Sequence, residues 1–175
     1  MDRREDPRAD VIPISQAPSA PHPAPAAAPP PPPRPGGPGQ VGRVGVVLVS
    51  HSQRLAEAVA SLATGLTRAT DPAPVAATGG SLADGLGTSA VLVAAAARRV
   101  DQGHGVAVLA DLGSAVGTVR ALLAEADEHG LPFPVRLADA PFVEGAVAAV
   151  ATASAGGDLA AVLDAAEEMY RQRKL

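Results

Sequence analysis

Several residue types are missing from this chain or scarce in it, and each absence limits its chemistry. None of its 175 residues is a cysteine, which excludes disulfides, thiolate metal sites and a cysteine nucleophile. Tryptophan is also absent and aromatic residues make up only 2 %, so a core must consist of alanine, valine and leucine. Hydrophobic residues make up 47 % of the chain, which is enough to form such a core.

Two further absences exclude whole classes of partner. The net charge is −4 and the chain has no basic block, which argues against nucleic-acid binding. No apolar run approaches the length that spans a membrane, and the amino terminus lacks the apolar stretch of a signal peptide. We therefore expect a cytoplasmic protein that has no membrane partner.

The chain also lacks the common means of holding a nucleotide. The glycine-rich loop Gly79–Gly87 has neither a GxGxxG nor a Walker spacing, and no cluster of lysine or arginine is present to bind a free triphosphate. We therefore expect no tightly bound cofactor, and no metal site is predicted. The chemistry must depend on side chains of this chain and on acceptors that a partner brings.

Proline divides the chain into two parts. Residues 1–40 contain 13 of the 18 prolines, with alanine, serine and glycine between many of them. Because proline fixes φ and lacks a backbone donor, this segment is predicted to be a disordered extension with polyproline II character. It is either a docking tail for a proline-recognising partner or a solvated extension. Residues 41–175 are predicted to form one folded domain.

Apolar runs and helical patterns alternate along this second part. The predicted strands are 44–49, 75–78, 106–110 and 135–138. The predicted helices are 54–67, 90–100, one that carries Val116 to Ala126 and stops at His129 and Gly130, 141–155 and a last one from 159 onward. The alternation predicts an α/β fold with a doubly wound, four-stranded, mainly parallel sheet of order 2-1-3-4 and helices on both faces. In the first helix, Leu55, Val59, Leu62 and Leu66 have the spacing of an apolar face.

His51 and Asp111 each follow a strand at the centre of this predicted sheet. In open α/β sheets, ligands bind beyond the carboxyl ends of the strands, at the point where the strand order reverses. The two side chains are therefore predicted to share one crevice although they are 60 positions apart. A carboxylate bonded to one ring N–H leaves the other imidazole nitrogen free to attack phosphorus, and it stabilises the positive charge that then develops.

Small residues near these two positions are candidates for holding phosphoryl oxygens through N–H and O–H groups. They are Ser52, Thr88, Ser89, Gly113 and Ser114. Structural roles stay open from position alone, because His51 could bond a loop carbonyl and Asp111 could cap the helix that follows it. Thr88 and Ser89 are also predicted helix caps, as is Asp158 for the last helix.

Four motifs occur together in the order and spacing of one known family. They are Val49–Ser52, Gly87–Ala90, Asp111–Ala115 and Ala140–Gly145. Through them, residues 43–170 resemble the DhaM family, the phosphotransferase subunits of bacterial PEP-dependent dihydroxyacetone kinase, whose fold is that of the mannose-family EIIA domains. The Pro-rich extension lies outside the family pattern.

This resemblance implies a phosphoryl relay in which His51 is the phosphorylated nucleophile and Asp111 orients it. The phosphoryl group would come from HPr and pass to ADP held on the DhaL subunit, while DhaK holds the dihydroxyacetone. Some family members carry fused HPr and enzyme I modules, which this sequence does not show, so a separate HPr is expected. The resemblance also implies a homodimer. The fourth strand, at the outer edge of the predicted sheet, is a candidate for pairing between the two copies. The loop Gly79–Gly87 with Asp84, together with Asp139, is expected to contribute to a docking surface for the partners.

Three other interpretations stay open. A mannose-type EIIA of a sugar permease would use the same histidine chemistry, although the residues at 111–115 and 140–145 favour the kinase subunit. A small metal chelatase would also place a histidine after a buried strand, but it needs further ligands that converge on the metal. A non-catalytic interaction module would leave His51 with a structural role alone.

Overall fold

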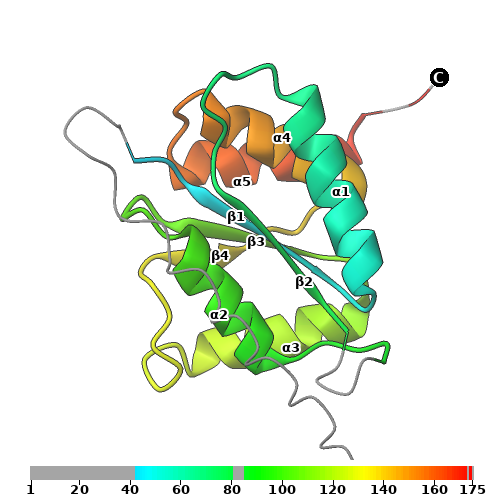
Figure 1. The fold of residues 1–175 in the computed structure, drawn as a ribbon, viewed down its shortest axis with the longest axis vertical. Helices are drawn as coiled ribbons and strands as arrows, with labels where there is room; N and C mark the ends of the chain where they lie inside the picture. Colours follow the sequence, from blue (N-terminus) through cyan, green and yellow to red (C-terminus); the bar gives the residue numbers. More distant parts are fainter. Residues whose placement is uncertain (1–41, 81–84, 173, 175) are drawn as a thin grey trace, which may run out of the picture. The chain divides into compact units, whose positions relative to one another are not determined.

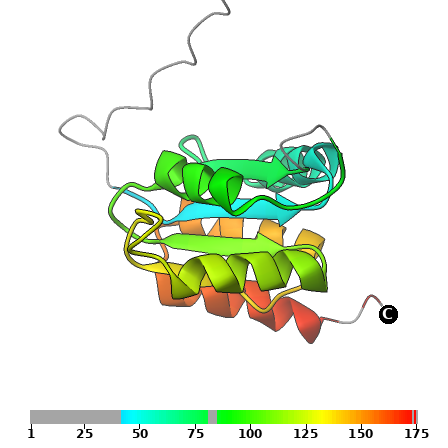
Figure 2. The ribbon, with the colours of Figure 1, turned by 90° about the horizontal axis from the view of Figure 1, so that it is seen from below.

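Four strands form a single sheet in the residues that the computed structural model describes, which are 42–80, 85–172 and 174. The strands are β1 (Gly45–Ser50), β2 (Val75–Gly79), β3 (Val106–Ala110) and β4 (Val135–Leu137). All pair in parallel in the order β2-β1-β3-β4, which confirms the predicted topology. Figure 2 shows β1, β2 and β3 running side by side in one direction. The predicted extension 1–40 and Asp84 lie outside the described residues.

β1 is buried along its whole length because both faces of the sheet are covered. Successive side chains of a strand point to opposite faces. Val46 and Leu48 accordingly join the core on one face, and Val47 and Val49 join the core on the other. The continuous apolar run in this part of the sequence is therefore the signature of a strand that is buried on two sides.

Helices pack on both faces of the sheet, as predicted (Figure 1). One face carries α1 (Gln53–Leu66), α4 (Phe142–Ser154) and α5 (Leu159–Glu167), and the other carries α2 (Ala90–Val100) and α3 (Gly113–Ala124). A short 3-10 helix, η1 (Glu168–Tyr170), continues from α5. Among the described residues, none of these helices combines the length and the apolar composition that crossing a bilayer requires.

The buried face of α1 differs in part from the predicted one. Val59 is buried as predicted, but Leu55, Leu62 and Leu66 are exposed to 44 %, 45 % and 60 %, and the other residues buried against the sheet and α4 include Ala56 and Ala63. The small alanine side chains let the helix approach its neighbours closely. The centre of the buried face is rotated about the helix axis from the predicted one, by less than the angle between two successive residues. A pattern weighted toward large apolar residues therefore identified Val59 but missed the alanines.

Two helix starts affect the functional site. α3 begins at Gly113, within the stretch 111–115 that was predicted to be a turn, so Gly113 and Ser114 form its first turn, and it ends at Ala124, before the predicted stop at His129. Ser89 takes the N-cap position of α2 but makes no side-chain cap hydrogen bond. Asp158 does cap α5 as predicted, because its Oδ1 accepts a hydrogen bond from the Ala161 N–H at 2.9 Å. β4 ends at Leu137, one residue earlier than predicted.

The two ends of the described domain lie at opposite ends of the parallel strands. Arg43, just before β1, donates from its backbone N–H to Gln102 Oε1 at 2.9 Å, and its guanidinium donates to the Ser154 carbonyl. Lys174 Nζ lies 2.5 Å from Glu144 Oε1, in the first turn of α4. Since α4 follows β4, Lys174 lies on the side of the sheet where the strands end, and Arg43 lies where they begin.

Candidate functional site

The backbone of His51 is held from two sides at the end of β1. Its N–H donates to Asp111 Oδ2 at 2.9 Å, and its carbonyl accepts hydrogen bonds from the N–H groups of Gly80 at 3.2 Å and Gly87 at 3.0 Å. Ser52 then caps α1, since its hydroxyl accepts from the Leu55 N–H at 3.4 Å. The imidazole therefore projects from a turn with little freedom to move, and the His51 side chain is 24 % exposed.

The structure brings His51 and Asp111 together, as their places after β1 and β3 predicted. His51 Nδ1 lies 2.9 Å from Asp111 Oδ1, and the Asp111 side chain is almost fully buried. An ionised carboxylate can only accept hydrogen bonds, so Nδ1 must carry the ring proton and Nε2 must carry the lone pair. This tautomer is assigned from the hydrogen bonding.

The Asp111 carboxylate accepts four hydrogen bonds. Oδ2 accepts from the Ser50 hydroxyl at 2.8 Å and from the His51 N–H, while Oδ1 accepts from His51 Nδ1 and from the Leu112 N–H at 2.7 Å. Burial by itself raises the pKa of Asp111, but the hydrogen bonds from His51, Ser50 and Leu112 outweigh it and hold this pKa below its ordinary value. The carboxylate is therefore ionised at neutral pH and can balance positive charge on the ring.

The alternative of Asp111 as a helix cap is wrong. Leu112 occupies the N-cap position of α3, and Asp111 lies one residue further out. Its bonds go to the adjacent Leu112 N–H and to β1, not to the N–H groups of α3 itself. The N-cap Leu112 has no oxygen in its side chain, so this helix begins without a side-chain cap.

Ser114 contacts the ring nitrogen that carries the lone pair. Its Oγ lies 2.6 Å from His51 Nε2, and because Nδ1 carries the ring proton, the serine hydroxyl must be the donor. Ser114 belongs to the first turn of α3, where the N–H groups of residues 113–115 have no hydrogen-bond partner among the described residues. Unpaired N–H groups at a helix start favour anions, so a phosphoryl group on Nε2 would lie beside donors.

Other residues predicted to surround the phosphoryl group have different contacts. The Thr88 hydroxyl lies 3.0 Å from Thr118 Oγ1, on α3, and the Ser52 hydroxyl is engaged as the cap of α1. For Ser89 the described part of the chain shows no side-chain bond that would point it at the site. Of the predicted phosphate-binding set, the structure thus places Ser114 and its neighbour Gly113 beside His51.

Ser50 is a site residue that sequence reasoning missed. It is fully buried, and its hydroxyl donates to Asp111 Oδ2 while accepting from the Ser52 N–H at 3.1 Å. The register of the two strands points to this contact, because Val49 pairs with Ala110 and the residues that follow them are Ser50 and Asp111. A polar residue at the end of a buried strand needs a hydrogen-bond partner, and the neighbouring strand supplies one.

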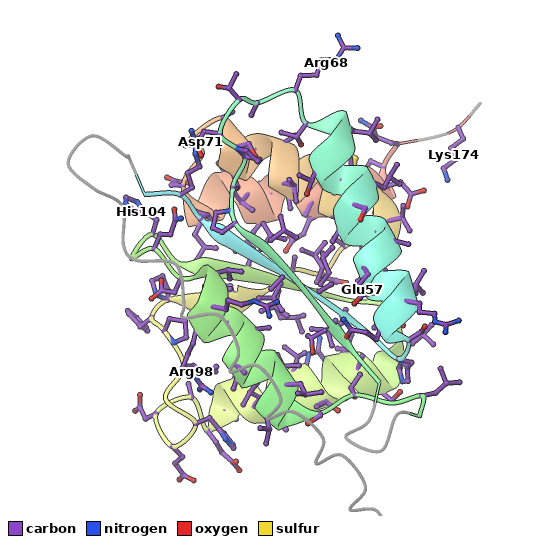
Figure 3. All side chains as sticks on the ribbon, in the orientation of Figure 1. Glu57, Arg68, Asp71, Arg98, His104 and Lys174 are labelled. Atoms are coloured by element: carbon purple, nitrogen blue, oxygen red, sulfur yellow. The ribbon has the colours of Figure 1, made fainter. Side chains whose placement is uncertain are left out.

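Other titratable residues lie apart from this cluster. His104 precedes β3, so it lies where the strands begin, whereas His51 lies where β1 ends. Figure 3 shows His104 far from Glu57, which lies in the first half of α1, the helix that follows His51. Asp139 follows β4, and its carboxylate accepts from the Tyr170 hydroxyl at 3.3 Å. No group of three or more histidine or acidic side chains within the described ranges is arranged to hold a metal ion.

Exposed apolar side chains adjoin the site. Leu112 directly follows Asp111, and Leu86 directly precedes Gly87, whose N–H bonds the His51 carbonyl. Both leucines are exposed in the described structure. These two exposed side chains are available for contact with another protein.

The comparison with protein families matches most of the folded part. The model described as "PTS system fructose IIA component" (EIIA-man) matches residues 45–163. A solved structure with the same kind of fold is the crystal structure of the unknown-function protein EF1359, with a TM-score of 0.57 and 26 % identity. The match covers 72 % of this chain and 94 % of that one.

Curated relatives with similar sequences share one description. The chain is 35 % identical over 134 residues to the phosphoryl donor subunit DhaM of PEP-dependent dihydroxyacetone kinase from Escherichia coli K12. It is 31 % identical over 132 residues to the subunit of that name from Providencia stuartii MRSN 2154. Each match covers 75 % of this chain but only 28 % of the relative, so the chain spans little more than a quarter of their length.

Proposed function

Because this chain belongs to the mannose-type EIIA family of the phosphotransferase system, as its motifs predicted, we propose that it carries a phosphoryl group on His51 Nε2. In this proposal HPr is the donor, and the acceptor is ADP on a DhaL subunit, which regenerates ATP for the phosphorylation of dihydroxyacetone bound to DhaK. The observation that carries the proposal is the hydrogen bond between His51 Nδ1 and Asp111, which leaves Nε2 as the nucleophile.

The transfer is a displacement at phosphorus. The Nε2 lone pair forms the new N–P bond while the N–P bond to the donor histidine breaks, and the donor nitrogen keeps the electron pair of that bond. If the other ring nitrogen of the donor histidine carries a proton, the donor imidazole is neutral after the transfer. His51 retains its Nδ1 proton, so the phosphorylated ring is positively charged and lies against the ionised carboxylate of Asp111.

The first turn of α3 supplies the donors for the phosphoryl oxygens. Its unpaired N–H groups at residues 113–115 and the Ser114 hydroxyl lie on the Nε2 side of the ring. The α3 dipole also favours negative charge at this end of the helix. A Cβ added to Gly113 would meet nothing within 4 Å, so the approach to this turn is open for a partner.

The acceptor has to arrive on another protein. Within the described ranges 42–80 and 85–172, the sequence shows neither a GxGxxG nor a Walker spacing and no cluster of lysine or arginine that would clamp a nucleotide. Leu86 and Leu112, which are exposed next to residues that bond His51 and Asp111, offer apolar contacts to such a partner. The same surface would serve HPr and DhaL in turn, so the two partners would compete for it. The proposal implies a cytoplasmic protein, since its donor chain starts from phosphoenolpyruvate.

A homodimer through β4 is part of the proposal. In the described residues, β4 pairs only with β3. The Pro134 carbonyl and the Ala138 N–H form hydrogen bonds with β3. Because the backbone groups of successive residues alternate in direction, those of Val135 and Leu137 point away from β3, toward the open edge. Beside this edge runs a groove of about 470 Å³ whose lining is mixed, with apolar residues such as Phe133 and the charged side chains of Arg120, Arg136 and Asp139. An open edge next to a groove that offers both apolar and charged contacts suits a second copy of the chain.

Stepwise reconstitution tests the proposed function. With phosphoenolpyruvate, enzyme I and HPr, the protein should gain the mass of one acid-labile phosphate, and NMR should place it on Nε2. His51→Ala should abolish the gain, whereas His104→Ala, at the end of the sheet where the strands begin, should retain it. The phosphoprotein should be stable to free ADP and discharged by DhaL carrying ADP. Discharge instead by a sugar-permease EIIB protein would refute the kinase assignment in favour of the permease one.

A further inference from the structure

The Ser114 hydroxyl occupies the position that a phosphoryl group must take. Its Oγ lies 2.6 Å from His51 Nε2, which is short even for a hydrogen bond from a hydroxyl. The lone pair that accepts this bond is the one that must attack phosphorus. A phosphorus atom cannot reach Nε2 while the hydroxyl holds the lone pair, so the resting structure contains a nucleophile that is covered.

The backbone of Ser114 is fixed, whereas its side chain can turn. The Thr118 hydroxyl donates to the Ser114 carbonyl at 3.1 Å, and Thr88 holds Thr118 in turn at 3.0 Å. Because Thr118 donates its only hydroxyl hydrogen to the Ser114 carbonyl, Thr88 must be the donor in the bond between the two threonines. The segment just before α2 thereby holds the start of α3 in place. Movement of the Ser114 hydroxyl is confined to rotation about χ1, which has three staggered positions.

Space for that rotation is present around the side chain. Ser114 is exposed, Gly113 precedes it in the first turn of α3, and Gly117 lies one turn further along the same side of the helix. A Cβ added at either glycine would meet nothing within 4 Å. No neighbouring side chain therefore blocks the hydroxyl from leaving Nε2.

We propose that Ser114 is a movable cover for the nucleophile, which rests on Nε2 and rotates away as the phosphoryl group arrives. In its second position the hydroxyl donates to a phosphoryl oxygen. The bond to Nε2 is broken and a bond to the phosphoryl group replaces it, with no proton transferred. This inference rests on the proposed function for its biological meaning, but the cover itself can be tested without any partner protein.

Phosphoramidate, which phosphorylates histidine directly, measures the availability of Nε2 in the full-length protein. Ser114→Ala should react faster than the wild type by about twofold to tenfold, because water replaces the lost donor and only the net strength of the hydrogen bond is removed. Ser61→Ala, which removes an exposed hydroxyl in the middle of α1, is the matched control and should react at the wild-type rate.

NMR of the imidazole nitrogens supplies the second measurement. Loss of the Ser114 hydroxyl should shift the Nε2 resonance, while the Nδ1 resonance keeps the signature of a protonated nitrogen bonded to Asp111. A Ser114→Ala protein that reacts with phosphoramidate at the wild-type rate or more slowly, with an unchanged Nε2 resonance, would overturn the proposal. Failure of HPr to phosphorylate His51 would overturn the proposed function, but the comparison of Ser114→Ala with the wild type in the phosphoramidate reaction would stay valid.

Discussion

Asp111 has a hydrogen-bond pattern that an amide cannot reproduce. All four of its partners are donors, two on each oxygen. In Asp111→Asn the amide nitrogen must face one of these pairs. If it faces His51 Nδ1, the ring proton moves to Nε2 and the nucleophile is lost. We expect a folded protein that accepts phosphate from HPr about a hundredfold more slowly. Stopped-flow or quench measurements of the transfer rate check this, and an unchanged rate would limit Asp111 to a structural role.

The lowered pKa of Asp111 makes a prediction about stability and pH. Because the folded pKa lies below the ordinary value of 3.8, the ionised side chain stabilises the fold at all pH values above 3.8, and this contribution is lost as the pH falls through the folded pKa. The difference in free energy of unfolding between the wild type and Asp111→Asn should therefore shrink below about pH 4. Urea titrations from pH 7 down to pH 3 measure it, and a constant difference would contradict the assignment.

At the scale of elements, the contact between β2 and the turn after β1 permits no side chain at one position. A Cβ on Gly79 would lie 2.5 Å from the Ser50 carbonyl oxygen and 2.9 Å from the Gln53 nitrogen. Both are backbone atoms, so Gly79→Ala must push β2 away from the segment that carries His51. We expect a loss of about 1–3 kcal/mol in the free energy of unfolding.

Gly65→Ala is the control for this substitution. Gly65 lies near the end of α1, and an added Cβ would meet nothing within 4 Å, so the alanine should stabilise the helix by up to about 1 kcal/mol. Chemical denaturation of both variants separates close packing from the general effect of replacing glycine. Equal effects of the two substitutions would show that the contact at Gly79 is not tight.

The elements show which features are readable from a sequence of this kind. β1 and β3 were predicted within one or two residues because a strand buried on both faces needs an uninterrupted apolar run, and few other structures do. The face of α1 was predicted only in part, because alanine carries most of its packing, and an alanine-rich helix has no single distinctive stripe. The pairing of His51 with Asp111 followed from strand order alone. The bond from Ser114 to Nε2 did not, since it depends on α3 starting at Gly113.

At the scale of the whole molecule, the edge of β4 predicts association. Phe133 is 92 % exposed in the described structure, so Phe133→Asp should leave the folded monomer intact. If the groove beside β4 holds a second copy, the substitution places a charge in the interface and should shift sedimentation from dimer to monomer at micromolar concentrations. A wild type that sediments as a monomer under these conditions would refute the dimer, whatever the variant does.

The separation of the two chain ends has a consequence for modular architecture. A sequence joined ahead of Arg43 is attached at the pole of the domain where the strands begin, remote from the nucleophile. A sequence joined behind Lys174 departs beside the first turn of α4, on the pole that carries His51. A downstream module on a short tether would therefore be concentrated near the reactive histidine, while an upstream one would need a linker long enough to travel around the domain. Under the proposed function, the carboxyl end is therefore the position from which an attached partner would compete best.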